Sequence, residues 1–248
     1  IYMNLEKYQQ YSRIARGLEK ADLVLKDARI VNVFTEEIIR GDIAIQDGII
    51  VGIGSFHGKE ERDLAGRYVC PGFIDSHLHL ESTLVTPAEL VTAASRHGTT
   101  TFIVDPHESA NVSGLAGIDY ILDQTEDVKA NVYVMMPSCV PATAIDDNGC
   151  TLTAEDMVPY LHNSRILGLG EVMDSISVVQ GEKSMHDKLE LFEGRIRDGH
   201  APFLEEGDLQ AYAMAGIATD HECSFFDYAM RERRNGLTIL VREGSAAR

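Results

Sequence analysis

Two histidines separated by one residue, His77 and His79, lie in an apolar run that begins at Phe73. Side chains alternate between the two faces of a β-strand, so both imidazoles are expected on one face while Leu78 points the other way. Polar residues also follow later apolar runs: Asp105 and His107, Glu171, His200, and Asp220 and His221. Each alone is equally well explained as a hydrogen-bonded group at a strand end. Their repeated occurrence at strand ends is what predicts a site.

The side chains in this set predict metal binding. Imidazole nitrogens and a carboxylate from separate strands suit Zn, Mn or Fe, and a carboxylate reached from two sides can bridge a metal pair. We expect Glu171 to be the bridging carboxylate. The ligands of the predicted binuclear site are then His77, His79, Glu171, His200 and His221.

The segments that carry these residues alternate between short apolar strands and helices from Pro71 onward. The strands are expected at 73–80, 99–105, 130–136, 166–171, 196–200, 216–220 and 237–243, and the helices near 87–97, 115–124, 154–161, 186–193, 207–215 and 224–235. This alternation indicates parallel strands joined by crossover helices. The predicted fold is α/β, a TIM (β/α)8-type barrel truncated before its last strand. The carboxyl ends of its strands would bring the polar residues to one mouth.

A different pattern precedes the barrel. A helix is expected at 8–19, and residues 21–54 form short β-branched runs that indicate a small β module. Asp47 and Gly48 separate two of these runs, a dipeptide typical of a two-residue hairpin turn. We therefore predict a helix and β-sandwich part of a composite module at 1–70 and an incomplete metal-dependent hydrolase barrel, strands 1 to 7, at 71–248.

Composition narrows the partners and the compartment. The 22 basic and 39 acidic residues give a net charge of −17, which disfavours nucleic acids and anionic membranes and favours a small neutral substrate. Four cysteines without a CxxC pair argue against a disulfide framework. No apolar run approaches the roughly 18 residues that span a bilayer, and the N-terminal stretch does not resemble a signal peptide. A soluble, cytoplasmic protein is expected.

Seven segments in order carry a more specific signal. They are PGFIDSHLHLES (71–82), GTTTFIVDPHESANV (98–112), MMPSCVPAT (135–143), GLGEVM (168–173), DGHAP (198–202), AGIATDHEC (215–223) and LVREGSAAR (240–248). PGFID with HxH is shared across the amidohydrolase superfamily, whereas the remaining motifs together are much narrower. In this order, which covers nearly the whole chain, the set resembles the adenine deaminase family of that superfamily.

The resemblance implies hydrolytic deamination of adenine to hypoxanthine and ammonia, a reaction of purine salvage. It implies a Mn, Fe or Zn pair on the five ligands named above, which would activate a hydroxide for attack on C6 of the purine. Members of the superfamily commonly use an aspartate at the end of the eighth strand as acid and base. The present sequence does not contain this position, so we expect the 248-residue chain alone to be weakly active or inactive.

Further residues are candidates for proton transfer or substrate contact. His107 could transfer a proton and Glu108 could bind the purine, or both could cap the helix that follows. Asp220 could transfer a proton or orient a ligand imidazole. Ser138 could line the pocket or belong to a rigid proline-rich loop, and Arg242 with Ser245 could contact substrate or form a salt-bridged loop.

Two other functions remain open at this point. One is a different cyclic amidohydrolase, such as a dihydroorotase-like C–N hydrolase. The other is a noncatalytic metal-binding scaffold. Barrels of this class often associate, so we also expect a homo-oligomer.

Overall fold

A computed structural model describes residues 3–143 and 145–242. Its internal contacts divide the chain into two compact units, Ile1–Pro71 and Gly72–Arg248. Each unit has its own hydrophobic core. The described residues contain no helix long and apolar enough to cross a membrane.

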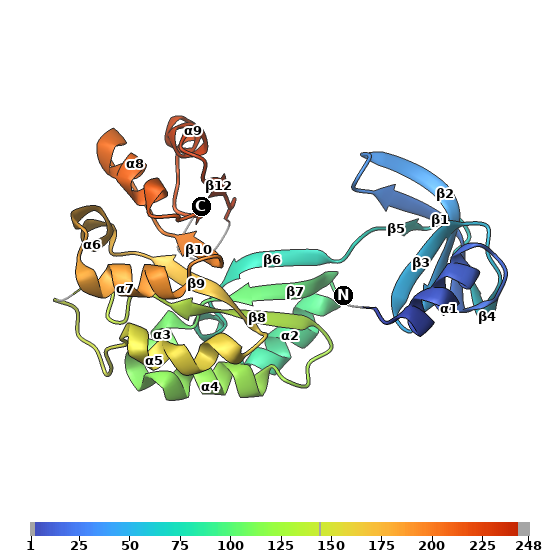
Figure 1. The fold of residues 1–248 in the computed structure, drawn as a ribbon, viewed down its shortest axis with the longest axis horizontal. Helices are drawn as coiled ribbons and strands as arrows, with labels where there is room; N and C mark the ends of the chain where they lie inside the picture. Colours follow the sequence, from blue (N-terminus) through green and yellow to red (C-terminus); the bar gives the residue numbers. More distant parts are fainter. Residues whose placement is uncertain (1–2, 144, 243–248) are drawn as a thin grey trace. The chain divides into compact units, whose positions relative to one another are not determined.

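The first unit is a five-stranded sheet with one helix (Figure 1). Its elements are α1 (Leu5–Ala15), β1 (Ala21–Asn32), β2 (Glu37–Gln46), β3 (Ile49–Gly54), β4 (Gly58–Asp63) and β5 (Tyr68–Val69). The strand order is β3-β2-β1-β4, with β5 also paired to β1. Antiparallel β2 and β3 are joined at Asp47 and Gly48, whose φ angles of 52° and 74° are those that a tight hairpin turn requires. This confirms the predicted hairpin.

The predicted helix of the first unit is shifted. It begins at Leu5, where Asn4 caps it by accepting a hydrogen bond from the Lys7 amide, and it ends at Ala15. Ile14 buries its side chain against Ala21, Val24 and Ala44 of the sheet. The helix is therefore held by its tertiary packing as well as by its cap.

The second unit contains seven parallel strands within the part of the chain that the structure describes. They are β6 (Phe73–Leu78), β7 (Thr99–Val104), β8 (Asn131–Pro137), β9 (Ile166–Val172), β10 (Ile196–Gly199), β11 (Thr219–Asp220) and β12 (Thr238–Ile239). The first five pair in sequence order, and β11 pairs with β12. The Ala218 amide donates to the Arg197 carbonyl at 3.0 Å, which places β11 beside β10. Sequential parallel order of this kind is that of a TIM-type barrel.

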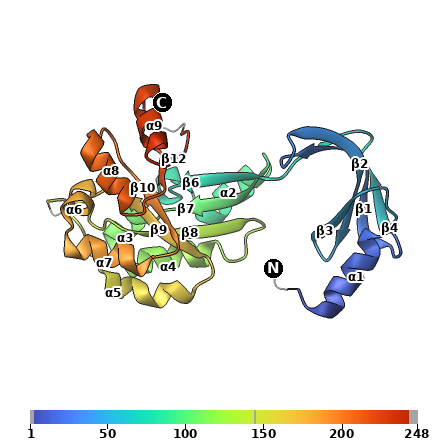
Figure 2. The same cartoon turned by 45° about the horizontal axis from the view of Figure 1, so that its top comes forward.

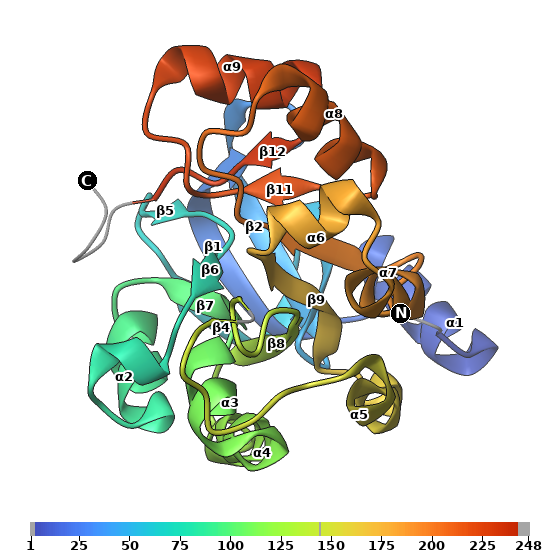
Figure 3. The same ribbon diagram turned by 90° about the vertical axis from the view of Figure 1, so that its left-hand side faces the viewer.

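Helices connect these strands and cover the outside of the sheet (Figures 2 and 3). They are α2 (Pro87–Ser95), α3 (His107–Ser113), α4 (Leu115–Gln124), α5 (Ala154–Met157), α6 (Ser175–Gln180), α7 (Lys183–Leu191), α8 (Glu206–Met214) and α9 (Phe226–Arg234), with 3-10 turns η1 (Glu81–Thr83) and η2 (Val158–His162). The helices α3 and α6 were not predicted from the sequence. The others lie within a few residues of their predicted positions.

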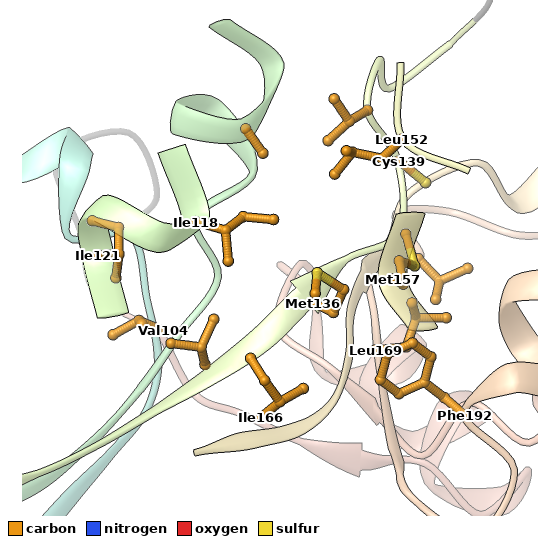
Figure 4. Packing of buried hydrophobic residues seen from close by; sticks show 14 of the residues in the cluster. Val104, Ile118, Ile121, Met136, Cys139, Leu152, Met157, Ile166, Leu169 and Phe192 are labelled. Atoms are coloured by element: carbon orange, nitrogen blue, oxygen red, sulfur yellow. The ribbon is translucent and has the colours of Figure 1, made fainter. Parts of the chain in front are cut away.

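The core of the second unit lies between strands and helices. Ile118 and Ile121 of α4 face Val104 of β7 and Met136 of β8, and Leu169 of β9 is fully buried in the same cluster (Figure 4). Apolar residues on both faces of β8 and β9 explain why these strands are continuous apolar runs in the sequence. This packing fixes the strand ends that carry the polar residues.

Candidate active site

The two histidines at the end of β6 are held through their Nδ1 atoms. His79 Nδ1 lies 2.8 Å from the carbonyl oxygen of Asp105, and His77 Nδ1 lies 3.0 Å from Asp198 Oδ2. A carbonyl can only accept, so His79 carries its proton on Nδ1 and its Nε2 has a free lone pair. The two Nε2 atoms are 3.2 Å apart, which shows both rings directed to one point.

Glu171, at the end of β9, lies at that point. Its Oε1 atom is 2.9 Å from His77 Nε2, 3.2 Å from His79 Nε2 and 2.9 Å from His221 Nε2. The side chain is buried, which by itself would raise the pKa of Glu171, but the ring nitrogens of His221, His77 and His79 close to Oε1 outweigh burial and lower it. The carboxylate is therefore ionised at neutral pH.

The remaining predicted ligands approach Glu171 from β10 and β11. The His221 ring stacks on His77 with centroids 3.7 Å apart, and His200 Nδ1 lies 4.0 Å from Glu171 Oε1. The ligand atoms of His77, His79 and Glu171 lie within 4.8 Å of one another, as do those of Glu171, His200 and His221. The five predicted ligands thus form two three-residue groups that share Glu171.

The donor atoms of the cluster fit a divalent cation. Among the described residues, His200 Nδ1 and both ring nitrogens of His221 are buried without a hydrogen bond of good geometry. Buried nitrogens without partners are costly unless something else satisfies them. Neutral imidazoles converging on a carboxylate are the usual donor set for Zn, Mn or Fe.

His107 joins the cluster from the first turn of α3. Its Nδ1 atom lies 3.3 Å from Glu171 Oε2 and 3.6 Å from Asp105 Oδ1. Burial lowers the pKa of His107, but the close Asp105 carboxylate and the charge of Glu171 raise it to about 9. The helix N-terminus that carries it is capped from a distance, because Glu81 Oε1 accepts from the amides of Glu108 and Ser109.

Asp220 is placed behind the cluster and not in its cavity. Its Oδ1 accepts from the Ala201 amide at 2.6 Å, and its Oδ2 accepts from the amides of Glu222 and Cys223 at 2.9 and 3.0 Å. These bonds hold the loop that presents His221. The geometry thus supports a structural role for Asp220, in which it holds this loop, and does not support proton transfer by this residue.

Glu232 of α9 lies beside Asp220 and is fully buried, and within the described ranges neither of its carboxylate oxygens has a hydrogen-bond partner. Burial and then the negative charge of Asp220 raise the pKa of Glu232 to about 8. The native state therefore holds this proton more tightly than the unfolded chain does, whose ordinary value is 4.5.

Glu232 is expected to make the protein less stable as the pH rises. Ionising Glu232 in the folded protein costs free energy. This cost is absent at pH values below the unfolded pKa and grows until the pH passes the folded pKa. Between about pH 5 and about pH 8, the free energy of unfolding should fall by roughly 3 to 4 kcal/mol more in the unmodified chain than in Glu232→Gln. Urea unfolding at both pH values measures this difference, and equal losses in the two proteins would contradict it.

A cavity of about 690 Å³ opens above Glu171. Glu108 and Arg242, two of the residues proposed from the sequence to contact substrate, line this cavity, and Arg242 pairs with Glu222. Other residues at its wall were not predicted, among them Asp75, Ser82, Thr83 and Met173.

Ser138 and Ser245 are the other two residues that were predicted to contact substrate. Ser138 lines a separate cavity of about 530 Å³, and its hydroxyl donates to the Glu171 carbonyl at 2.7 Å. It therefore acts on the strand end that carries Glu171. Ser245 lies outside the described residues.

The sequence pattern of the amidohydrolase family matches residues 68–242, which include every residue of the cluster. The chain belongs to this family. Its members are hydrolases of the TIM-barrel fold, and the family generally uses divalent metals. Both properties agree with the strand order and the donor set described above.

Relatives within the family are similar over nearly the whole chain. An adenine deaminase from Desulfitobacterium hafniense is 58% identical over 246 residues, which are 99% of this chain and 43% of that protein. An adenine deaminase from Clostridium acetobutylicum is 49% identical over 236 residues, 94% of this chain and 41% of that protein. The chain thus spans about two fifths of the length of these relatives.

Solved structures of amidohydrolases share the fold. A β-aspartyl dipeptidase from Fervidobacterium islandicum has a TM-score of 0.58 at 14% identity, covering 89% of this chain and 64% of that one. An atrazine chlorohydrolase from Arthrobacter aurescens, complexed with zinc, has a TM-score of 0.52 at 13% identity, covering 88% and 70%. The expected barrel architecture is confirmed.

Proposed function

We propose that the protein acts in the hydrolytic deamination of adenine to hypoxanthine and ammonia. The observation that carries this proposal is the convergence of four histidines and His107 on the single carboxylate Glu171, in a chain 58% identical to an adenine deaminase. These relatives favour a purine substrate over that of a dihydroorotase-like hydrolase.

We propose two divalent cations, Mn, Fe or Zn, at this cluster. His77, His79 and Glu171 would hold one, and Glu171, His200 and His221 the other. Bound cations would supply Lewis-acid stabilisation and lower the pKa of water. The structurally similar chlorohydrolase was solved in complex with zinc, which is one of these three metals.

The chain's own residues would bind and orient adenine beside Glu171. His107, whose Nδ1 atom lies 3.3 Å from Glu171 Oε2, lines the cavity and would deliver a proton to the departing amino group. Glu108, held by a hydrogen bond from Ser82 at 2.6 Å, offers a carboxylate to ring N–H groups, and Arg242, paired with Glu222, lines the same cavity. Glu171 itself is 3% exposed, and electrostatic interactions with so buried a carboxylate are stronger than in water.

The compartment and assembly are part of the same proposal. Four free cysteines support a reducing compartment such as the cytoplasm. We also propose a homo-oligomer, because barrels of this class often associate.

Adenine turnover tests the proposal directly. The 248-residue chain should be assayed alone and fused to the remaining length of the Desulfitobacterium hafniense relative, after metal removal and after addition of Mn, Fe or Zn. We expect metal-restored conversion of adenine to hypoxanthine with ammonia release in the fusion, and much weaker turnover by the chain alone.

The two alternative functions predict different results in these assays. Hydrolysis of cyclic amides without purine turnover would replace adenine deamination by a different amidohydrolase activity. Stoichiometric metal binding without hydrolysis of either substrate class would indicate a noncatalytic scaffold.

A further inference from the structure

Asp198 is a buried carboxylate that has no role in the reaction proposed above. It lies on β10, two positions before His200, which directly follows the strand. Its Oδ2 atom is 3.0 Å from Nδ1 of His77, a residue 121 positions away on β6. The Asp198 side chain is only 7% exposed, so there is little competition from water for this contact.

Thr219 of β11 fixes the orientation of Asp198. The Thr219 hydroxyl donates to Asp198 Oδ1 and accepts from the Gly199 amide at 3.3 Å. A hydroxyl has one proton to donate, and the Gly199 amide can only donate, so the direction of both bonds is determined. Because Thr219 occupies Oδ1, Oδ2 is left for His77.

We propose that Asp198 is a positioning residue, which keeps the His77 proton on Nδ1 and directs the Nε2 lone pair to the cation beside Glu171. This inference rests on the proposed metal site. The partner histidine His79 has a neutral acceptor, the Asp105 carbonyl, at its own Nδ1. His77 is therefore the more basic ligand of the pair, because a carboxylate stabilises positive charge on its ring more strongly than a carbonyl does.

The position of Asp198 argues against direct coordination at Glu171. It contacts the Nδ1 edge of His77, whereas Glu171 Oε1 lies 2.9 Å from the Nε2 atom on the other side of the ring. A residue at Nδ1 acts on a cation near Glu171 through the ring. Loss of its charge should weaken metal binding without removing a ligand.

The test compares Asp198→Asn, Asp198→Ala, Thr219→Val and Thr219→Ser, with Glu232→Gln as a control for loss of a buried carboxylate elsewhere. Zinc dissociation constants are measured by competition with a chelator of known affinity, and metal stoichiometry by elemental analysis. In the metal-stripped proteins, 15N NMR of the imidazoles reports which nitrogen of His77 carries the proton.

We expect zinc affinity to fall about 10-fold in Asp198→Asn and about 100-fold in Asp198→Ala. Thr219→Val should change affinity in the same direction by a smaller factor, while Thr219→Ser and Glu232→Gln should match the unmodified protein. His77 should hold its proton on Nδ1 in the unmodified protein and lose this preference in Asp198→Ala.

Three results would overturn the proposal. They are unchanged affinity and tautomer in Asp198→Ala, loss of one metal equivalent with an unchanged His77 tautomer, and failure of the unmodified protein to bind any divalent cation. A failure of the adenine assay would leave this proposal standing, because neither zinc affinity nor the His77 tautomer depends on turnover.

Discussion

Glu171→Gln is expected to lower adenine turnover by at least about 1,000-fold, the scale seen when a central charge-stabilising group is removed. The amide has one oxygen and one N–H₂ group, so it cannot present two anionic oxygens to imidazoles that approach within 2.9 to 3.3 Å. On the proposed two-cation site, bound metal should fall from two equivalents to one or fewer. Initial rates and elemental analysis of the fusion protein measure both effects.

Glu155→Gln is the matched control for this change. Glu155 is an exposed residue on α5, outside the cavity above Glu171. It should retain turnover and metal content. Near-normal turnover with two bound metal equivalents in Glu171→Gln would exclude a bridging task for this carboxylate.

Gly168→Ala is expected to destabilise the second unit by about 3 kcal/mol or more, or to prevent its folding. A Cβ atom at Gly168 would lie 1.9 Å from the Ile196 carbonyl oxygen and 3.1 Å from Met135 Cε. The oxygen belongs to the backbone of β10, so relief requires separation of β9 from β10. Glu171 follows three residues later on β9 and would be displaced with it.

Gly207→Ala provides the opposite expectation on the same chain. Gly207 lies in helix α8 with no atom within 4 Å of an added Cβ, so alanine should stabilise the helix by up to about 1 kcal/mol. Urea unfolding of both variants measures these differences. A change below about 0.5 kcal/mol in Gly168→Ala would show that β9 and β10 can separate at little cost.

The strands of the barrel could be predicted because burial on both faces leaves an unambiguous apolar run, as in β8 and β9. Helix α4 was predicted at its observed bounds, since its apolar residues recur with helical spacing. The strand β4, GKEERD, was missed because it is an edge strand with five exposed residues and no alternating apolar pattern. Helix α3 was missed because Glu81, far away in sequence, supplies its cap.

The site could be predicted only as far as strand parity and strand ends allow. These rules placed His77 and His79 on one face and Glu171 at the same edge. They could not predict where the side chains of Asp220 and Ser138 point, because their hydrogen-bond partners are backbone groups of other segments. Asp198 shares its parity with His200, but its contact with His77 depends on how β10 faces β6 inside the folded unit.

Strand order has a consequence for the order of folding. Each βα segment can dock on its predecessor through local contacts, which is favourable for rapid assembly. The imidazole cluster is different, because His77 of β6 contacts Asp198 and His221, which lie more than a hundred positions later in the chain. An intermediate with only the early strands docked would lack the cluster, so acquisition of metal affinity during refolding would mark the closing event of the pathway.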